Sequence, residues 1–365
     1  MRNAAQASTT ASDRVGDRPA RLSPAIVYVV VVACVVAGWA GPTPVVAAEK
    51  LYVLSSHADD MAVIDVATDK VLRYVKVGAK PHGIAAPRSQ DILWVANEHD
   101  STLTAVDPLT DKVIGTYSGF GGRLNEIEIT PDGRFIYVPA YSDGTYEVFD
   151  TQKKKIIKRI SVKGKPHNVV TTSDGTRMYL SPLAPNNDIY IVDTSTHSVI
   201  TTIDCGNGGR PIAISPDDKW LYVNTDNLLG FLVLDLASNK IVATCRYELT
   251  EEEKLVRSRS HGIAVTPDGK EIWSCDVTHN LIHAFDATQF PPKHIARVAT
   301  GGHPYWVAMT PDGKTLYVPN TSDDTVSVID VRGKKERARI QIGKGKGPKR
   351  MLVLTVPDRA IGVGD

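Results

Sequence analysis

The sequence predicts an all-β protein whose main domain is a seven-bladed β-propeller, with each blade a four-stranded antiparallel sheet. The first observation is a unit of about 42 residues that recurs along the chain, a period typical of propeller blades. The second is the tight-turn sequence Pro-Asp-Gly, which recurs between alternating, β-branched segments. The third is composition, because 28 Gly and 22 Pro among 365 residues favour short strands and turns over long helices.

Each repeat unit has an aromatic residue at the start of its second strand and an aspartate at the end of its third strand. The aromatic positions are Tyr52, Trp94, Tyr137, Tyr179, Tyr222, Trp273 and Tyr317. The aspartates are Asp65, Asp107, Asp150, Asp193, Asp235, Asp286 and Asp330. The Pro-Asp-Gly turn is intact at 131–133, 267–269 and 311–313, where glycine suits the backbone of a tight hairpin. Because each series has seven members, we expect seven blades.

The two ends of the repeat region are predicted to complete one blade together. The first unit begins at Leu51 with a second strand, and no first strand precedes it. The segment 350–355 supplies an unpaired first strand after the last complete unit. Joining the two closes blade one and leaves no exposed sheet edge that would invite aggregation.

The first 48 residues have the pattern of an export signal rather than of a blade. A basic, polar segment precedes an apolar run at 25–40, and small residues lead to a predicted cleavage after Ala48. We therefore expect residues 1–48 to be a signal peptide, 49–358 the propeller and 359–365 a C-terminal tail. The expected location is the periplasm or the extracellular space. The alternative is a retained membrane anchor at 25–40, although this run is shorter than the ~20 residues that a span needs.

Charge and cysteine content bear on the class of protein. Lys and Arg number 42 and Asp and Glu 41, so the chain lacks the basic excess expected of a nucleic-acid binder. Removing Cys34 with the signal leaves Cys205, Cys245 and Cys275, and the sequence does not determine which of them pair, if any. Neither a CxxC zinc motif nor a CxxCH haem motif is present.

Several units resemble the repeats of the YVTN family of β-propellers. The stretches 263–269 (IAVTPDG) and 316–320 (LYVPN) carry the resemblance, which covers residues 49–358. It implies the propeller fold. Propellers of this type resemble surface-layer proteins, periplasmic binding proteins and the propeller domains of amine dehydrogenases and nitrous oxide reductase, so the resemblance leaves the function open.

Seven of the ten histidines map to one face of the predicted propeller, which we call the upper face. This face carries the loops that lead into first strands and the loops between second and third strands. The Pro-Asp-Gly turns lie on the opposite, lower face. The place where the first strand begins is polar in every unit and is assigned to Arg350, His82, Asn125, His167, Arg210, His261 and Tyr305. Other loops of the upper face add His57, His99, His279 and His303.

Three interpretations of this polar rim are open. The first is a copper or zinc site at the mouth of the channel, because imidazole binds both metals, with ligands drawn from His82, His167, His261, His57, His99, His279 and His303. The second is an anion site, because arginine binds carboxylates with two hydrogen bonds, with candidates Arg210, Arg350, Asn125 and Tyr305. The third is a polar channel in which these side chains bind loop carbonyls and water.

Two glutamates and one insertion break the repeat. Glu126 and Glu128 stand in a first strand where other units have small or apolar residues, and a buried carboxylate needs a partner. Glu128 is a candidate general base or ligand-binding group. The alternative for the two carboxylates is a pair with Arg123 or contact with channel water. The segment 246–260 departs furthest from the repeat, and a capping box that begins at Thr250 predicts a short helix on the upper face.

Two classes of function follow from these observations. The first is an exported binding or scaffold protein that holds a protein or a small molecule through its histidine-rich upper face. The second is a metal-dependent enzyme, an oxidoreductase or a lyase or lactonase, with His82, His167 and His261 as ligands or acid–base groups. Contact with a membrane is expected only if the N-terminal segment is retained.

Overall fold

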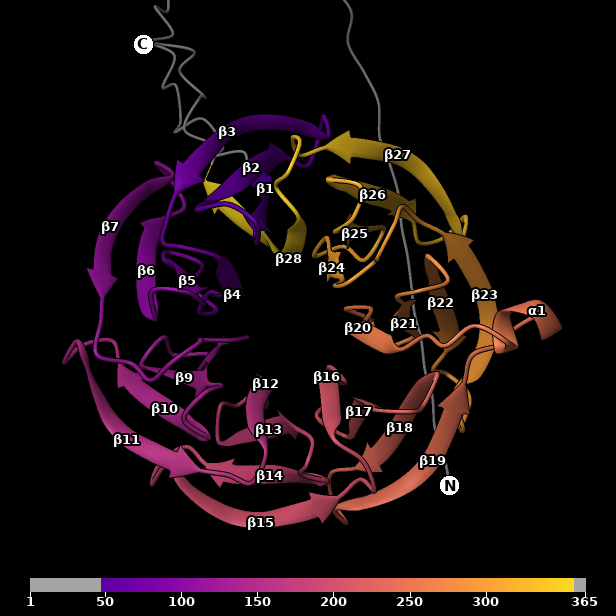
Figure 1. The fold of residues 1–365 in the computed structure, drawn as a ribbon, viewed down its shortest axis with the longest axis horizontal. Helices are drawn as coiled ribbons and strands as arrows, with labels where there is room; N and C mark the ends of the chain where they lie inside the picture. Colours follow the sequence, from indigo (N-terminus) through magenta and orange to yellow (C-terminus); the bar gives the residue numbers. More distant parts are fainter. Residues whose placement is uncertain (1–46, 358–365) are drawn as a thin grey trace, which may run out of the picture. The chain divides into compact units, whose positions relative to one another are not determined.

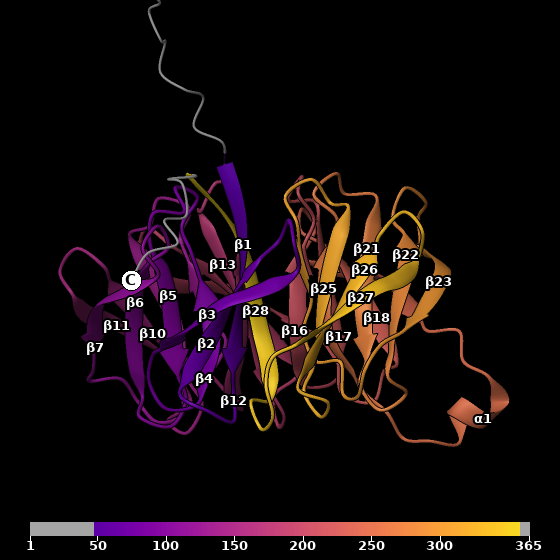
Figure 2. The same ribbon diagram turned by 90° about the horizontal axis from the view of Figure 1, so that it is seen from above.

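The computed structural model describes residues 47–357, which form seven four-stranded antiparallel sheets arranged in a ring (Figure 1). The predicted seven-bladed propeller is therefore confirmed. Within each sheet the four strands follow one another from the axis outward, as the repeat predicts. In the side view of Figure 2 the strands of every blade run between the two faces of the ring.

The first four blades contain the following strands, in order from the innermost outward. Blade 1 contains β28 (Pro348–Pro357), β1 (Ala47–Ser55), β2 (Asp60–Asp65) and β3 (Lys70–Lys76). Blade 2 contains β4 (Pro81–Ala85), β5 (Leu93–Asn97), β6 (Thr102–Asp107) and β7 (Lys112–Tyr117). Blade 3 contains β8 (Glu128–Ile129), β9 (Phe135–Ala140), β10 (Thr145–Asp150) and β11 (Lys155–Ser161). Blade 4 contains β12 (Lys165–Thr171), β13 (Arg177–Leu183), β14 (Asp188–Asp193) and β15 (Ser198–Asp204).

The last three blades have the same order. Blade 5 contains β16 (Gly209–Ile214), β17 (Trp220–Thr225), β18 (Gly230–Asp235) and β19 (Lys240–Arg246). Blade 6 contains β20 (Ser260–Val265), β21 (Glu271–Asp276), β22 (Leu281–Asp286) and β23 (Lys293–Ala299). Blade 7 contains β24 (Ala308–Met309), β25 (Thr315–Asn320), β26 (Thr325–Asp330) and β27 (Lys335–Gln341).

The repeated aromatic residue joins neighbouring blades. The hydroxyl of Tyr52 in blade 1 donates to the carboxylate of Asp111 in a turn of blade 2 (2.8 Å). Tyr137 of blade 3 makes the corresponding contact with the Nδ1 atom of His197 in blade 4 (2.7 Å). Both rings are fully buried, so each carries a large apolar surface into the space between two blades while its polar end finds a partner.

The repeated aspartate shapes the turn that follows the third strand. The Oδ1 atom of Asp65 accepts a hydrogen bond from the backbone N–H of Ala67 (3.0 Å). Asp107 does the same with Leu109 (2.8 Å). An aspartate that binds the backbone two residues later fixes a tight turn, and the same contact is made by Asp150, Asp193, Asp235 and Asp286.

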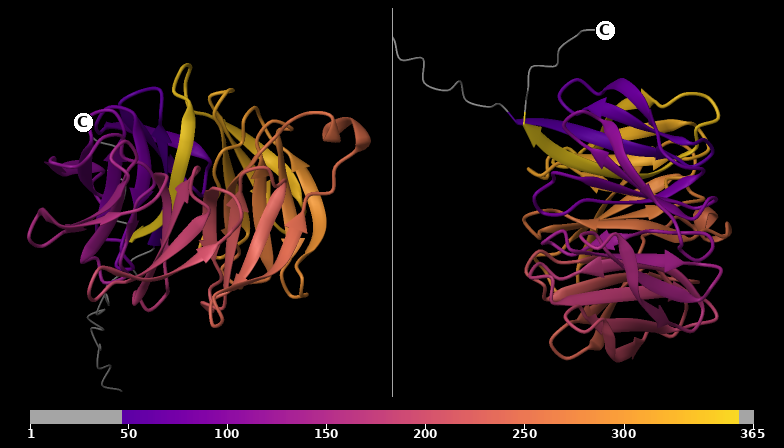
Figure 3. Two further views of the ribbon diagram at one scale, coloured as in Figure 1. Left: turned by 60° about the horizontal axis from the view of Figure 1, so that its bottom comes forward. Right: turned by 90° about the vertical axis from the view of Figure 1, so that its left-hand side faces the viewer.

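Blade 1 is closed by both ends of the described chain, as predicted. β28 pairs with β1 antiparallel, with Leu51 opposite Val353, and the two strands lie side by side in Figure 3. The closing strand is longer than the predicted 350–355, because pairing continues to Ala47 opposite Pro357. The predicted cleavage after Ala48 therefore lies within β1, while the rest of the expected signal and the segment 358–365 lie outside the described residues.

The predicted helix is present as α1 (Glu251–Lys254), with Thr250 as its N-cap and both hydrogen bonds of the capping box formed. It projects from the ring between blades 5 and 6 (Figures 1 and 2). Cys205, Cys245 and Cys275 are all buried free thiols, so no disulfide joins them. No helix among residues 47–357 is long and apolar enough to cross a membrane.

Candidate functional site at the axis of the propeller

Strand register places the first-strand residues of six blades as predicted but shifts those of blade 1 by one position. Leu54 pairs with Arg350, whereas the equivalent Ala96 of blade 2 pairs with Gly83. Lys349 therefore occupies the place of His82, and Arg350 lies one residue further along the strand. The prediction that Arg350 is equivalent to the histidines was wrong, because the two ends of the chain pair in a register that residue counting alone does not reveal.

The three predicted first-strand histidines converge on the axis. His82, His167 and His261 are exposed by 5%, 5% and 0%. The rings of His167 and His261 have centroids only 5.9 Å apart, although blade 5 separates their blades in the sequence. Among the described residues, His82 Nε2, His167 Nδ1 and His261 Nε2 are buried without a hydrogen-bond partner. Asn125 lies at the equivalent place in blade 3 and is also buried.

Arg350 is fully buried beside these imidazoles. Its guanidinium carbon lies 3.7 Å from the centre of the Trp306 ring, a cation–π contact. Its Nε atom lies 2.9 Å from Oε2 of Glu126, and none of its three nitrogens makes a hydrogen bond of good geometry within residues 47–357. A buried guanidinium with unused donors is costly, so this group is suited to binding an anion.

His82 and Glu98 form a hydrogen-bonded dyad at the same end of the channel. Nδ1 of His82 lies 3.1 Å from Oε2 of Glu98, whose other oxygen accepts two hydrogen bonds from the guanidinium of Arg123 (3.0 and 2.7 Å). These contacts lower the pKa of Glu98 to about 2, with the His82 hydrogen bond as the largest cause. An ionised carboxylate can only accept, so the His82 proton resides on Nδ1 and Nε2 keeps a free lone pair.

Burial keeps the three imidazoles neutral. The pKa of His82 is lowered to about 3, chiefly by desolvation and then by the charge of Lys349. Desolvation also lowers the pKa values of His167 and His261 well below their usual range, and Arg350 is the next cause for both. An anion bound to Arg350 would oppose that positive charge and raise the basicity of the imidazoles.

The remaining predicted histidines do not join this cluster. His57, His99 and His303 are exposed. His279 binds Asp276 (2.7 Å) and the backbone oxygen of Glu253 (2.9 Å), which ties α1 to blade 6.

No group of three or more His, Cys, Asp or Glu side chains in the described part of the chain is arranged to hold one metal ion. The cations Arg350 and Lys349 would also repel a divalent metal from the His82, His167 and His261 imidazoles. The geometry of the described residues therefore gives no support to a copper or zinc centre, which stays a prediction from the sequence.

A second positively charged hollow adjoins the axis on the upper face. Arg210 pairs with Asp226 there, with its Nε atom 2.7 Å from the carboxylate. The hollow has a volume of about 290 Å³, and its lining also contains Arg257, Arg259 and His303. Tyr305, a predicted ligand-binding residue, is flanked by the charges of Lys349 and Arg259, which lie 4.6 and 5.8 Å from the centre of its ring. The upper face is therefore electropositive near the axis.

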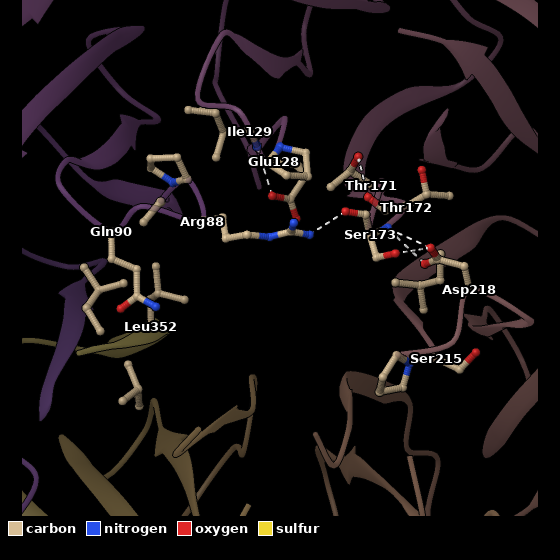
Figure 4. A pocket seen from close by; sticks show the side chains of 17 residues that line it. Arg88, Gln90, Glu128, Ile129, Thr171, Thr172, Ser173, Ser215, Asp218 and Leu352 are labelled. Atoms are coloured by element: carbon tan, nitrogen blue, oxygen red, sulfur yellow. Dashed lines mark hydrogen bonds between the residues drawn. The ribbon is translucent and has the colours of Figure 1, made fainter. Parts of the chain in front are cut away.

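The lower end of the axis is a separate cavity of about 370 Å³, whose lining residues are shown in Figure 4. The Glu128 side chain lines it, and its Oε1 atom accepts a hydrogen bond from the N–H of Ile129 (2.9 Å). Arg88 of blade 2 reaches across to blade 4 and donates to the backbone oxygen of Ser173 (2.5 Å). Burial raises the pKa of Glu128 to about 7 and that of Glu126 to about 8, with Arg350 opposing the second shift.

The predicted pairing of these glutamates with Arg123 was wrong. Arg123 binds Glu98, and Glu126 instead meets Arg350 from blade 1. Sequence reasoning also missed Glu98 and Trp306. Glu98 stands next to His99 in the loop after the second strand of its unit, so its place on the upper face could have been inferred. Nothing in a single sequence shows that it turns toward His82.

The fold and this cluster define a seven-bladed propeller with a buried cationic and histidine-rich site where the first strands meet. The profile of the family described as "Lactonase, 7-bladed beta-propeller" matches residues 48–339, and the chain belongs to this family.

Individual proteins give a broader picture of what this chain is similar to. The curated protein Antigen Lp49 of Leptospira interrogans is 25% identical over 187 residues, which are 46% of this chain and 41% of that protein. The periplasmic gluconolactonase PpgL of Pseudomonas aeruginosa superposes with a TM-score of 0.71 at 17% identity, covering 85% of this chain and all (100%) of that one. Hydrazine synthase of Kuenenia stuttgartiensis superposes with a TM-score of 0.67 at 20% identity, covering 75% and 90% of the two chains. At such identities these structures show the fold alone.

Proposed function

We propose that this protein hydrolyses a lactone that carries anionic or hydroxyl groups, such as a sugar-acid lactone, at the upper end of the axis. The observation that carries the proposal is the Glu98–His82 dyad beside the buried guanidinium of Arg350. A base that is oriented by a carboxylate, next to a cation that can stabilise an oxyanion, is the arrangement that acyl transfer to water requires. Membership of the lactonase-type family supports this interpretation.

The chemistry assigns one role to each group. Nε2 of His82 accepts a proton as water attacks the lactone carbonyl carbon, and Glu98 stabilises the imidazolium that forms. Arg350 binds the carbonyl oxygen, on which negative charge develops. The ring C–O bond then breaks, and the imidazolium returns the proton to the leaving alkoxide. The resulting hydroxy acid ionises and releases one proton to solvent.

A binding protein without catalysis is the second candidate, and the strongly lowered pKa of His82 favours it. An imidazole with a pKa of about 3 is a weak base unless the ligand itself raises that value. The same cationic site would then hold an anionic small molecule without chemical change. Export of the protein remains a prediction in either case.

The test is hydrolysis of δ- and γ-aldonolactones, followed with a pH indicator and corrected for the spontaneous rate. We expect Arg350→Met to lower kcat by about 10²–10³ and His82→Gln by about 10²–10⁴. Arg339→Met is the matched control, because Arg339 pairs with Glu336 on the outermost strand of blade 7. Gluconate binding without lactone turnover would replace the hydrolase with the binding protein, and equal turnover by Arg350→Met would overturn the assigned site.

A further inference from the structure

Glu126 is the one acidic side chain in contact with Arg350 among residues 47–357. Glu126 comes from blade 3 and the guanidinium from blade 1, so the contact spans the innermost strand of blade 2, which lies between them. The equivalent position in blade 2 is Gly83, which has no side chain to obstruct it. Both partners are almost inaccessible to solvent, with exposed fractions of 5% for Glu126 and 0% for Arg350.

An anionic ligand and the Glu126 carboxylate would compete for the same guanidinium. Two anions held side by side in a region of low dielectric repel each other strongly, even with Lys349 near Arg350 as a second cation. The repulsion disappears if the carboxylate takes up a proton. A neutral carboxyl group can also donate a hydrogen bond to the ligand, whereas a carboxylate cannot.

We propose that Glu126 is a displaceable counter-ion: an anion that binds Arg350 takes its place, and Glu126 accepts one proton, delivered from the lower cavity through Glu128. This inference rests on the anion-binding part of the proposed function and does not require catalysis. Its consequence is that, in the alkaline range where Glu126 is ionised, the upper site binds an anion together with a proton, so that the charge of the buried cluster stays constant.

The two glutamates stand two residues apart where the chain enters β8, with Glu128 as the first residue of that strand. After burial, the negative charge of Glu128 is a further cause of the raised pKa of Glu126, so the two carboxyl groups interact. Glu128 lines the lower cavity (Figure 4), whereas Arg350 is not among the residues that line it. A ligand bound on the upper face would block the path by which a proton reaches Glu126 from the solvent above. The lower cavity would then offer a second path for the proton.

Other titratable groups around Arg350 also respond to an anion, and their pH ranges separate them from Glu126. Because the pKa values of His82, His167 and His261 are lowered, these imidazoles take up protons only at a pH below the usual range of histidine. Lys349 has a pKa lowered by burial and would gain a proton at alkaline pH. Arg210 lies further out, paired with Asp226. Lys349 is therefore the group that an experiment must distinguish from Glu126.

The probe is gluconate, an unreactive product analogue, with sorbitol as the uncharged control. Calorimetric titration in buffers of different ionisation enthalpy gives the number of protons taken up per bound ligand. In the protein without ligand, Glu126 has a pKa of about 8. We therefore expect the number of protons taken up per gluconate to rise from near zero at pH 7 to about one at pH 9.5. The affinity for gluconate should fall about tenfold per pH unit above pH 8. Glu126→Gln should bind gluconate with neither effect, and Lys349→Met should keep both.

The outcomes of these titrations distinguish the counter-ion role of Glu126 from the anion site itself and from the proton route. Uptake that persists in Glu126→Gln and vanishes in Lys349→Met would overturn the counter-ion role, and so would pH-independent binding by the unaltered protein. Failure to bind gluconate at all would refute the anion site of the proposed function as well. For the route, stopped-flow mixing with a pH indicator should show slower proton uptake in Glu128→Gln at unchanged stoichiometry. Uptake at the original rate would contradict delivery through Glu128.

Discussion

Deleting residues 348–365 should prevent cooperative folding, because it removes the strand that closes the ring. β28 buries the side chains of Met351, Leu354 and Val356, which are exposed by only 2%, 2% and 3%, and Val353 is exposed by 9%. At about 1.5–3 kcal/mol for each fully buried side chain, the four contribute roughly 6–12 kcal/mol. The net stability of a typical domain is about 5–15 kcal/mol, so the loss is comparable to the whole. The deletion also exposes the paired edge of β1 along nine residues.

Unfolding in guanidinium chloride, monitored by tryptophan fluorescence and circular dichroism, tests this expectation. The truncated protein should show a broad, non-cooperative transition or aggregate before any transition is seen. The matched control is deletion of 358–365 alone, which leaves β28 whole and should keep the original midpoint. If the 348–365 deletion unfolded with the midpoint and slope of the full chain, the shared closure of blade 1 would be wrong as a source of stability.

Two further predictions concern the core and the buried imidazole. Leu354→Ala should lower the free energy of unfolding by about 2–5 kcal/mol, because Leu354 is buried. The control Ile200→Ala, on the half-exposed outer strand of blade 4, should change it by about 0.5 kcal/mol or less. Equal effects of the two variants in chemical denaturation would contradict the assigned core. His82 has a folded pKa of about 3 against about 6.5 when unfolded, so its contribution is present above pH 6.5 and is lost as pH falls. Between pH 6.5 and 5 that contribution falls by about 1.6 kcal/mol, and the unfolding free energies of the native protein and His82→Gln should change relative to each other by this amount. Parallel pH curves would show that His82 is not buried in its neutral form.

The ring could be predicted from sequence because its determinants are local and repeated. Tyr52 and its equivalents mark the second strand, and Asp65 and its equivalents mark the turn after the third strand. These residues act on neighbours within one blade or the next, so their spacing carries the information. Even the closure of blade 1 follows, because a missing strand at one end and a surplus strand at the other can be counted.

The candidate site was predicted only in part, because its contacts cross the axis. Counting along the repeat placed His82, His167 and His261 at one level, and the structure brings His167 and His261 within contact. It could not place Arg350, whose register depends on pairing between the two ends of the chain. It also assigned Arg123 to the nearest glutamates in the sequence, whereas the salt bridge is made to Glu98 of the preceding blade.

The position that Arg350 occupies explains how a sevenfold repeat produces an asymmetric site. The equivalent residues at this level are Gly83, Glu126, Asn168, Pro211, Gly262, Trp306 and Arg350. A Cβ atom at Gly83 would lie 2.3 Å from the backbone oxygen of Asn125, and one at Gly262 would lie 2.5 Å from the Cα atom of Trp306. The backbones of neighbouring blades thus approach too closely for a side chain at two of the seven places. Because space near the axis is limited, the small residues of blades 2 and 6 leave room there for the guanidinium, the indole and the carboxylate. The sequence differences among otherwise equivalent repeats, rather than the repeat itself, therefore determine which side chains meet at the axis.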